Sequence, residues 1–181
     1  MGSGMQMENR KFQAAIITIS DKGSVGQRVD TSGPAIQEIL SEHQWDVTFT
    51  TIIPDEQEQI QDMLMKCADE MKIPLILTTG GTGFSKRDVT PEATKAVIHK
   101  EALGIAEAMR LESLKVTPMG MLSRATAGIR EDSLIVNLPG SEKAVRECLG
   151  AIIKPLYHGV GILLGSANEC AQVHGLHKNE K

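Results

Sequence analysis

The feature that most constrains the fold is a regular alternation of short, continuously apolar runs with segments of helical periodicity. The apolar runs are AAIITI (14–19), VTFTTII (47–53), LILTT (75–79) and LIVNL (134–138). Between them, apolar residues recur every three or four positions, most regularly from Ile60 to Met71. Strands that are apolar on both faces and alternate with helices are typical of a parallel sheet buried between helical layers. The sequence therefore predicts an α/β domain of the three-layer α/β/α type with a mostly parallel central sheet.

The chain is expected to form one domain. Its 181 residues suit a single unit, since domains usually span about 100–200 residues. The apolar share of 41% is enough for a buried core. We assign residues 12–165 to this domain. Residues 1–11, which begin with MGSG, are interpreted as a cloning remnant and N-terminal lead, and residues 166–181 as a polar C-terminal tail.

Charge and cysteine content argue against several classes of partner. The net charge of −4 disfavours nucleic acid, because proteins that bind it usually carry a basic face. No apolar run approaches the roughly 18 residues of a membrane span, so no membrane partner is expected. The three cysteines form no Cys-x-x-Cys pair, which favours reduced thiols in a cytoplasmic protein without structural zinc.

Turn chemistry predicts where several helices begin and end. Pro34 suits the first residue of a helix. Asp55 suits a helix N-cap, with Glu58 as its partner in a capping box. Pro155 is expected to kink or split the last helix. The loop over residues 22–33 is long for a strand-to-helix connection, and loops of that length are usually functional or mobile. Further helices are expected to begin at Thr90, Ala102 and Ser141.

Each predicted strand is followed directly by polar or glycine-containing residues. These are Ser20-Asp21, Pro54-Asp55, Gly80 to Asp88 and Asn137 to Ser141. The carboxyl ends of parallel strands meet at one edge of a sheet, and ligands of such proteins bind there. We therefore expect all four segments to face one binding region.

The glycine run Gly80-Gly81-Thr82-Gly83 can be interpreted in two ways. Glycines let backbone N–H groups converge on an anion and let a ligand approach closely. Thr82 adds a hydroxyl group, and Lys86 and Arg87 add positive charge nearby. A tight turn with solvated cations has the same composition. The run is neither a Walker A motif nor GxGxxG, so its residues alone leave both interpretations open.

The acidic residues at this edge carry a similar ambiguity. Asp88 precedes a helix start, where a carboxylate is stabilised by the helix dipole. It could instead hold a divalent cation against phosphates, and so could Asp55. Their shared position beside the glycines favours a functional role. Ser20-Asp21 and the Pro139-Gly140-Ser141 turn can equally be loop and cap chemistry, and Arg124 can be a surface ion pair or a phosphate contact.

Six short motifs occur together in a specific order. They are Ile19-Ser20-Asp21, Pro54-Asp55-Glu56, Thr79-Gly80-Gly81-Thr82-Gly83, Arg87-Asp88-Val89-Thr90-Pro91-Glu92-Ala93, Leu122-Ser123-Arg124 and Asn137-Leu138-Pro139-Gly140-Ser141. This combination resembles the molybdopterin adenylyltransferase family of bacteria and the related G domains of plant and animal molybdenum-cofactor proteins. The resemblance runs from about Phe12 to Gly165. It implies an α/β/α domain of the molybdopterin-binding type.

The resemblance also implies an activity. Such enzymes are nucleotidyltransferases that move AMP from ATP to the terminal phosphate of molybdopterin with Mg²⁺, releasing pyrophosphate. They serve molybdenum cofactor biosynthesis, are typically cytoplasmic homotrimers, and are expected to make transient contact with other molybdenum-cofactor enzymes.

Site residues follow from the same resemblance. Asp55 and Asp88 match the catalytic acids and are the candidate metal ligands. The matching substrate-binding positions are Ser20, Asp21, Gly80, Gly81, Thr82, Gly83, Arg87, Glu107, Ser123, Pro139, Gly140 and Ser141. One residue departs from the family pattern: Glu142 stands where many relatives carry proline, and its carboxylate could disfavour an anion beside Ser141.

Two alternatives remain at this level. A non-catalytic molybdopterin-binding or carrier paralogue would share the fold, although the presence of both Asp55 and Asp88 favours an enzyme. The molybdate-insertion branch also carries the fold, but usually with additional domains.

Overall fold

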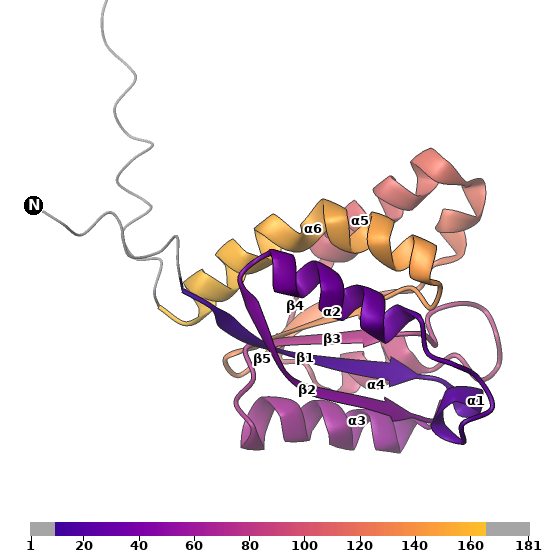
Figure 1. The fold of residues 1–181 in the computed structure, drawn as a ribbon, viewed down its shortest axis with the longest axis horizontal. Coiled ribbons are helices and arrows are strands. Elements are labelled where there is room, and N and C mark those ends of the chain that lie inside the picture. The colour runs from indigo at the N-terminus through magenta and orange to yellow at the C-terminus, as the bar shows by residue number, and fades with distance from the viewer. Residues whose placement is uncertain (1–9, 166–181) are drawn as a thin grey trace, which may run out of the picture.

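A computed structural model describes residues 10–165 of the chain, which form one mixed sheet between two helical layers (Figure 1). The strands are β1 (Phe12–Ile19), β2 (Trp45–Ile53), β3 (Leu75–Thr79), β4 (Lys100–Glu101), β5 (Ala127–Arg130) and β6 (Ser133–Leu138). Their order across the sheet is β2-β1-β3-β6-β5-β4. The first four strands in this order are parallel, and β5 runs antiparallel to both of its neighbours, β6 and β4. The predicted mostly parallel three-layer domain is confirmed.

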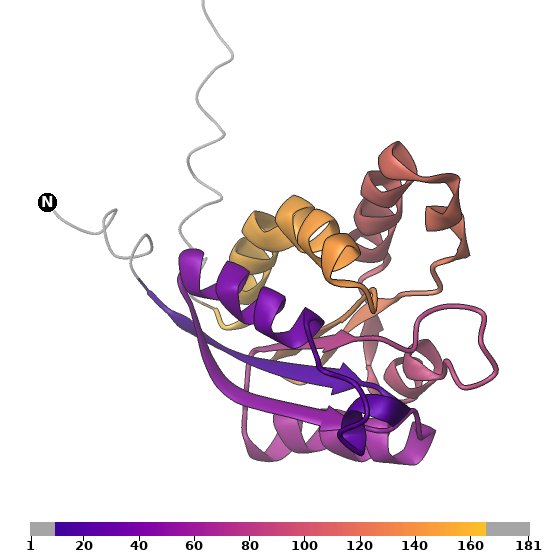
Figure 2. The same cartoon turned by 45° about the vertical axis from the view of Figure 1, so that its right-hand side comes forward.

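Two sets of helices cover the two faces of the sheet. On one face lie α2 (Ser32–Glu42), α5 (Leu103–Val116) and α6 (Glu142–Leu163), and on the other lie α3 (Gln57–Met65) and α4 (Thr90–Val97), as Figures 1 and 2 show. Three shorter helical segments join these elements: α1 (Asp21–Ser24), the π-helical turn η1 (Lys66–Glu70) and the 3-10 helix η2 (Pro118–Leu122).

The alternation of side chains along β1 divides the apolar interior into two cores. Ala14 and Ile16 pack with α2, α5 and α6, whereas Ala15 and Ile17 pack with α3 and α4. This arrangement explains why β1 and β3 are largely apolar, because both faces of these central strands are covered by helices. Strand β2 lies at the sheet edge and alternates between half-buried and exposed residues along much of its length.

The antiparallel strands β4 and β5 were not predicted. Lys100 and Glu101 are both exposed and charged, and a strand of two residues leaves no periodic signal. The AGIR segment that forms β5 is similarly short. Both strands owe their place to pairing with β6 and with each other rather than to their own sequence.

Several helix ends differ from the predicted ones. Helix α2 begins at Ser32, so Pro34 is its third residue, and the loop before it contains the short helix α1. Helix α3 begins at Gln57 with no side-chain cap, so the capping box of Asp55 and Glu58 is wrong. Helix α6 continues through Pro155 and is not split.

The two ends of the described domain lie together, opposite the carboxyl edge of the parallel strands. The Tyr157 hydroxyl in the C-terminal half of α6 donates to the Arg10 carbonyl at 2.7 Å, and its ring contacts Phe12 at the start of β1. Helix α6 begins at the other edge, directly after β6. Figure 1 shows this arrangement, with the start of β1 and the end of α6 on the same side of the molecule.

Some predictions fall outside residues 10–165. Cys67 and Cys148 are buried free thiols, as expected, whereas Cys170, the N-terminal lead and the polar tail lie outside the described residues. The assigned domain boundaries therefore remain predictions. Within the described part of the chain, no helix combines the length and the apolar character that crossing a membrane requires.

Candidate active site

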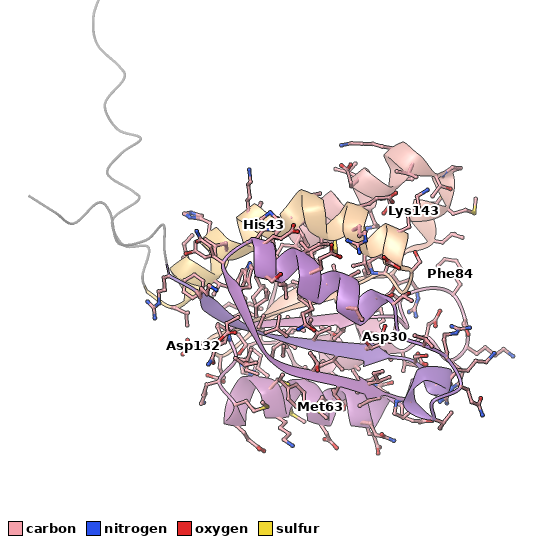
Figure 3. The ribbon with its side chains drawn as sticks, viewed as in Figure 1. Asp30, His43, Met63, Phe84, Asp132 and Lys143 are labelled. Atoms are coloured by element: carbon pink, nitrogen blue, oxygen red, sulfur yellow. The ribbon has the colours of Figure 1, made fainter. Side chains whose placement is uncertain are left out.

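A pocket of about 360 Å³ lies where the parallel strands end. Its lining residues are Thr18, Ile19, Ser20, Gly23, Arg28, Val29, Asp30, Thr31, Ser32, Asp55, Thr79, Gly80, Gly81, Asp88, Gly140 and Ser141. They follow β1, β2, β3 and β6, so the four predicted segments do meet at one edge. Asp30 and Phe84 mark this side of the molecule in Figure 3, and Asp132 marks the opposite side.

The glycine turn after β3 brings backbone against the pocket. Gly80 and Gly81 have φ angles of 100° and 64°, which favour glycine. A Cβ atom at Gly80 would lie 2.3 Å from the Ile19 carbonyl oxygen, and one at Gly81 would lie 2.3 Å from Thr90 Oγ1. Thr90 fastens the turn, because its hydroxyl donates to the Gly80 carbonyl at 2.9 Å and its N–H donates to the Gly81 carbonyl at 3.1 Å. The glycines are therefore needed for close packing within the protein, and they also line the pocket where a ligand can approach.

Asp55 faces the pocket with one oxygen atom that no other described residue engages. The Asp21 N–H donates to Asp55 Oδ2 at 2.9 Å, and the Asp55 N–H donates to Asp21 Oδ1 at 3.0 Å. This reciprocal pair fixes the Asp55 carboxylate and turns Oδ1 toward Gly81. Burial raises the pKa of Asp55, and the nearby carboxylates of Asp21 and Asp88 raise it further. The protein therefore stabilises the ionised carboxylate of Asp55 only in part, and a bound cation would stabilise it further.

Asp88 enters the pocket from the loop after β3. It does not cap α4, whose N-cap residue is Val89 without a side-chain hydrogen bond. Instead, Asp88 Oδ2 accepts a hydrogen bond from the Ser85 N–H at 3.0 Å. Within residues 10–165, nothing donates to its other carboxylate oxygen. Asp55 and Asp88 therefore each present a free oxygen to one pocket, and two such oxygens suit a hard divalent cation that takes further ligands from a substrate.

Arg87 occupies a different place from the predicted one. Its guanidinium donates to Asp21 at 3.0 and 2.9 Å and to Glu56 at 2.7 Å. These bonds lower the pKa of Asp21 and raise the pKa of Arg87. Neither Arg87 nor Asp21 lines the pocket. Their ion pair and the bond from Arg87 to Glu56 instead join the segments that follow β1, β2 and β3. Sequence showed a cation beside the glycines, but not the acid that neutralises it.

Arg124 holds the loop that carries Asp88. Its guanidinium donates to the carbonyls of Gly83 and Asp88, both at 2.6 Å, and pairs with Glu92. The backbone N–H of Arg124 donates to the Thr82 carbonyl at 2.9 Å. Thr82 and Gly83, which were expected in the substrate pocket, are bonded to Arg124 through their carbonyls and do not line the pocket. Of the two interpretations of Arg124, the structure bears out the ion pair and adds a loop-fastening role.

The turn after β6 completes the pocket. Gly140 and Ser141 line it, whereas Pro139 does not. The Gly140 carbonyl accepts from the Ser32 hydroxyl at 2.8 Å, which joins this turn to the start of α2. The Ser141 hydroxyl accepts from the Ala144 N–H at 3.3 Å and caps α6. Glu142 pairs with Arg146 at 3.1 Å and does not line the pocket, which removes the objection to Ser141.

Two further predicted residues do not reach the pocket in this structure. Glu107 is exposed on α5, and the Ser123 hydroxyl accepts from the Ala125 N–H at 3.4 Å. In contrast, the lining includes Arg28 and Asp30, which sequence reasoning missed. The one signal in the sequence is the length of the loop over residues 22–33, which indicates a functional or mobile loop but does not single out these two side chains.

The fold and pocket define a class of α/β protein in which a glycine turn and acidic side chains line a pocket at the carboxyl edge of the parallel strands, where such proteins bind their ligands. Residues 15–159 match the family described as "Probable molybdopterin binding domain", and the chain belongs to this family. The family resemblance inferred from the motifs is confirmed.

Known relatives span most of the chain. It is 46% identical over 153 residues to the molybdopterin adenylyltransferase of Helicobacter pylori strain J99, covering 83% of this chain and 87% of that protein. It is 43% identical over 166 residues to gephyrin of Dictyostelium discoideum, covering 86% of this chain and 23% of that protein. The crystal structure of the molybdopterin biosynthesis enzyme MoaB from Thermus thermophilus is similar with a TM-score of 0.81 and 45% identity, covering 85% of this chain and 97% of that chain.

Proposed function

We propose that the chain is a molybdopterin adenylyltransferase, which transfers AMP from ATP to the terminal phosphate of molybdopterin and releases pyrophosphate. The observation that carries the proposal is the pair of half-free carboxylates, Asp55 and Asp88, facing a glycine-lined pocket. Relatives that carry this name are 46% and 44% identical over most of the chain. The activity serves the biosynthesis of the molybdenum cofactor.

The reaction requires the protein to bring together two polyanions, ATP and molybdopterin. An oxygen of the pterin's terminal phosphate attacks the α-phosphorus of ATP, and the bond to the β-phosphate oxygen breaks as pyrophosphate leaves. No group passes to the protein, so its task is positioning and electrostatic stabilisation. Gly80 and Gly81 allow phosphates to approach the backbone closely, and Ser141 places the N-terminus of α6, with its partial positive charge, at the same pocket.

We propose that Asp55 and Asp88 hold Mg²⁺ during turnover. Bound there, the ion would neutralise phosphate charge and stabilise the leaving pyrophosphate. The fit rests on the free oxygen of each carboxylate and on the burial that raises the pKa of Asp55. Among the described residues, no three or more His, Cys, Asp or Glu side chains cluster as a metal site, so the remaining ligands would be phosphate oxygens and water, as Mg²⁺ commonly takes.

The decisive experiment is pyrophosphate release by the purified protein supplied with ATP and molybdopterin. We expect release that requires the pterin and stops when Mg²⁺ is chelated. A protein that binds molybdopterin but releases no pyrophosphate would be a carrier, and the proposed enzyme activity would be wrong.

We further propose that the chain works as a homotrimer in the cytoplasm. The apolar residues Ile152, Ile153 and Leu156 of α6 are buried in the chain's own core and offer no surface for assembly. Exposed apolar side chains instead gather along α5 and η2: Leu111, Leu114, Val116, Met119, Met121 and Leu122. Such patches are often interfaces. Light scattering at micromolar concentration should give three times the mass of one chain, and a single-chain mass would contradict assembly.

A further inference from the structure

We infer that Arg28 binds a phosphate group of the substrate and is a substrate-binding residue of the pocket. The identity of that substrate rests on the proposed function. Within the described part of the chain, Arg28 is the one lysine or arginine that lines the pocket, whereas Asp30, Asp55 and Asp88 line it with carboxylates. The side chains of the lining thus carry more negative than positive charge, although the ligand is a polyanion. A cation at this position therefore has a large electrostatic effect on binding.

The other arginines near the site cannot replace Arg28. Arg87 is bonded to Asp21 and Glu56, and Arg124 is bonded to Glu92 and to two backbone carbonyls. Arg28 is exposed and makes no hydrogen bond or ion pair with any other residue in the range 10–165. Its guanidinium keeps all its donors for a ligand.

Asp30 lies two residues away but does not compete for Arg28. One of its oxygens accepts from the Thr18 hydroxyl at 2.7 Å, and the other accepts from the N–H groups of Ser32 and Gly33, both at 3.0 Å. The carboxylate is therefore already compensated by three donors, two at the start of α2 and one on β1. Its role is to fix the base of the loop against β1, where Figure 3 labels it.

The loop between α1 and α2 holds Arg28 beside the pocket. Asp30 anchors one end of the loop, and the Gln27 N–H anchors the other by donating to the Lys22 carbonyl at 2.8 Å. Between these anchors Val29 is 83% exposed, so the segment around Arg28 is not packed into the core. The guanidinium can thus turn toward a bound phosphate without breaking a hydrogen bond or ion pair to the described residues.

The chemistry of the guanidinium selects phosphate. Its planar array of N–H donors matches two phosphate oxygens at once, which a lysine ammonium group does not reproduce. Two phosphate sources exist in the proposed reaction, the triphosphate of ATP and the terminal phosphate of molybdopterin. Each binds without turnover when the other is absent, so their affinities can be measured separately.

The test compares Arg28→Gln and Arg28→Lys with Lys86→Gln as the matched control. Lys86 is an exposed cation on the loop after β3 that does not line the pocket, so its loss changes net charge equally. Calorimetric titration with inorganic tripolyphosphate, and then with ATP or molybdopterin alone, gives the affinities. We expect Arg28→Gln to weaken tripolyphosphate binding by about 10-fold or more, Arg28→Lys to weaken it less, and Lys86→Gln to change it by less than about 2-fold. Arg28 contacts a phosphate of whichever substrate, ATP or molybdopterin, loses affinity to the same extent in Arg28→Gln.

The outcomes separate this inference from the proposed function. Equal affinities for Arg28→Gln and Lys86→Gln, or no tripolyphosphate binding by the unmodified protein, would overturn the role of Arg28. If the unmodified protein binds tripolyphosphate through Arg28 but releases no pyrophosphate from ATP and molybdopterin, then Arg28 remains an anion-binding residue and the proposed reaction is wrong. Thermal unfolding of all three variants should match that of the unmodified protein, because Arg28 has no partner to lose among the described residues.

Discussion

Replacing Arg124 with glutamine should loosen the Asp88 loop and slow the reaction. The substitution removes two hydrogen bonds from a charged donor to the carbonyls of Gly83 and Asp88, and the ion pair with Glu92. Charged hydrogen bonds are each worth about 1.5–3 kcal/mol, and an exposed ion pair is worth about 0.2–1 kcal/mol. The Arg124 side chain is 33% exposed, so water recovers part of the loss. We expect a net cost of about 3 kcal/mol in unfolding free energy and a fall in Tm of about 6–12 °C.

Arg130 provides a matched control at the other edge of the sheet. Its guanidinium donates to the Asp69 carboxylate at 2.9 Å and to the Val97 carbonyl at 2.8 Å, and its side chain is only 17% exposed. It pairs with Ser133 at the start of β6, beside Asp132, which Figure 3 places opposite the pocket. Arg130→Gln should therefore cost at least as much stability as Arg124→Gln without moving Asp88.

The assay is pyrophosphate release at 25 °C together with urea unfolding of both variants. Arg124→Gln should lower kcat by about 10-fold or more, since small misplacements of a positioned group can cost up to about 100-fold. Arg130→Gln should keep kcat within about 2-fold of the unmodified protein, and Arg124→Lys should restore part of the Arg124→Gln loss. Equal kcat values for the two glutamine variants would refute a positioning role and leave Arg124 as a purely stabilising residue.

Three further predictions concern the pocket itself. Asp88→Asn should leave Tm and pterin affinity nearly unchanged but lower single-turnover adenylylation by about 100-fold or more, and a near-normal rate would remove Asp88 from catalysis. Because burial raises the pKa of Asp55, its carboxyl group binds a proton more tightly in the folded protein than in the unfolded chain. Protonation of Asp55 therefore stabilises the fold fully below the ordinary pKa of an aspartate, and this stabilisation is lost as pH rises through the folded pKa. The stability of Asp55→Asn relative to the unmodified protein should therefore increase between about pH 4 and pH 7 in urea unfolding, and a decrease would contradict the burial argument. Gly81→Ala should cost about 2 kcal/mol in the same assay, because its Cβ would meet Thr90 Oγ1 at a positive φ, and an unchanged midpoint would show that the turn adapts.

The central architecture was predictable because its signals are local. A strand buried on both faces must be largely apolar, and β1, β3 and β6 are. The glycines and acids could be assigned to one edge because they follow parallel strands directly. Strands β4 and β5 could not be predicted, since they are defined by their pairing with residues distant in sequence.

The roles of the charged residues were harder to predict. Arg87 stands beside the glycines in sequence, but its partner Asp21 lies 66 positions away, and only the fold shows that the two neutralise each other. The space around Gly81 could not be judged from the sequence either, because only the fold shows that Thr90 Oγ1 leaves no room for a side chain there. Asp55 was predicted as a cap or a metal ligand. Its reciprocal hydrogen bonds with Asp21 rule out the cap and leave one oxygen free among the described residues.

The position of the domain's two ends bears on how this unit can be joined to others. Arg10 and the C-terminal half of α6 meet at the edge of the sheet opposite the pocket. A polypeptide attached before β1 or after α6 would leave from that far side, so a fusion partner need not cross the pocket mouth. The unit can therefore work as a module within a larger polypeptide, and in Dictyostelium gephyrin the matching segment is 23% of the protein. Tethering by either terminus would leave the pocket facing away from the attached segment.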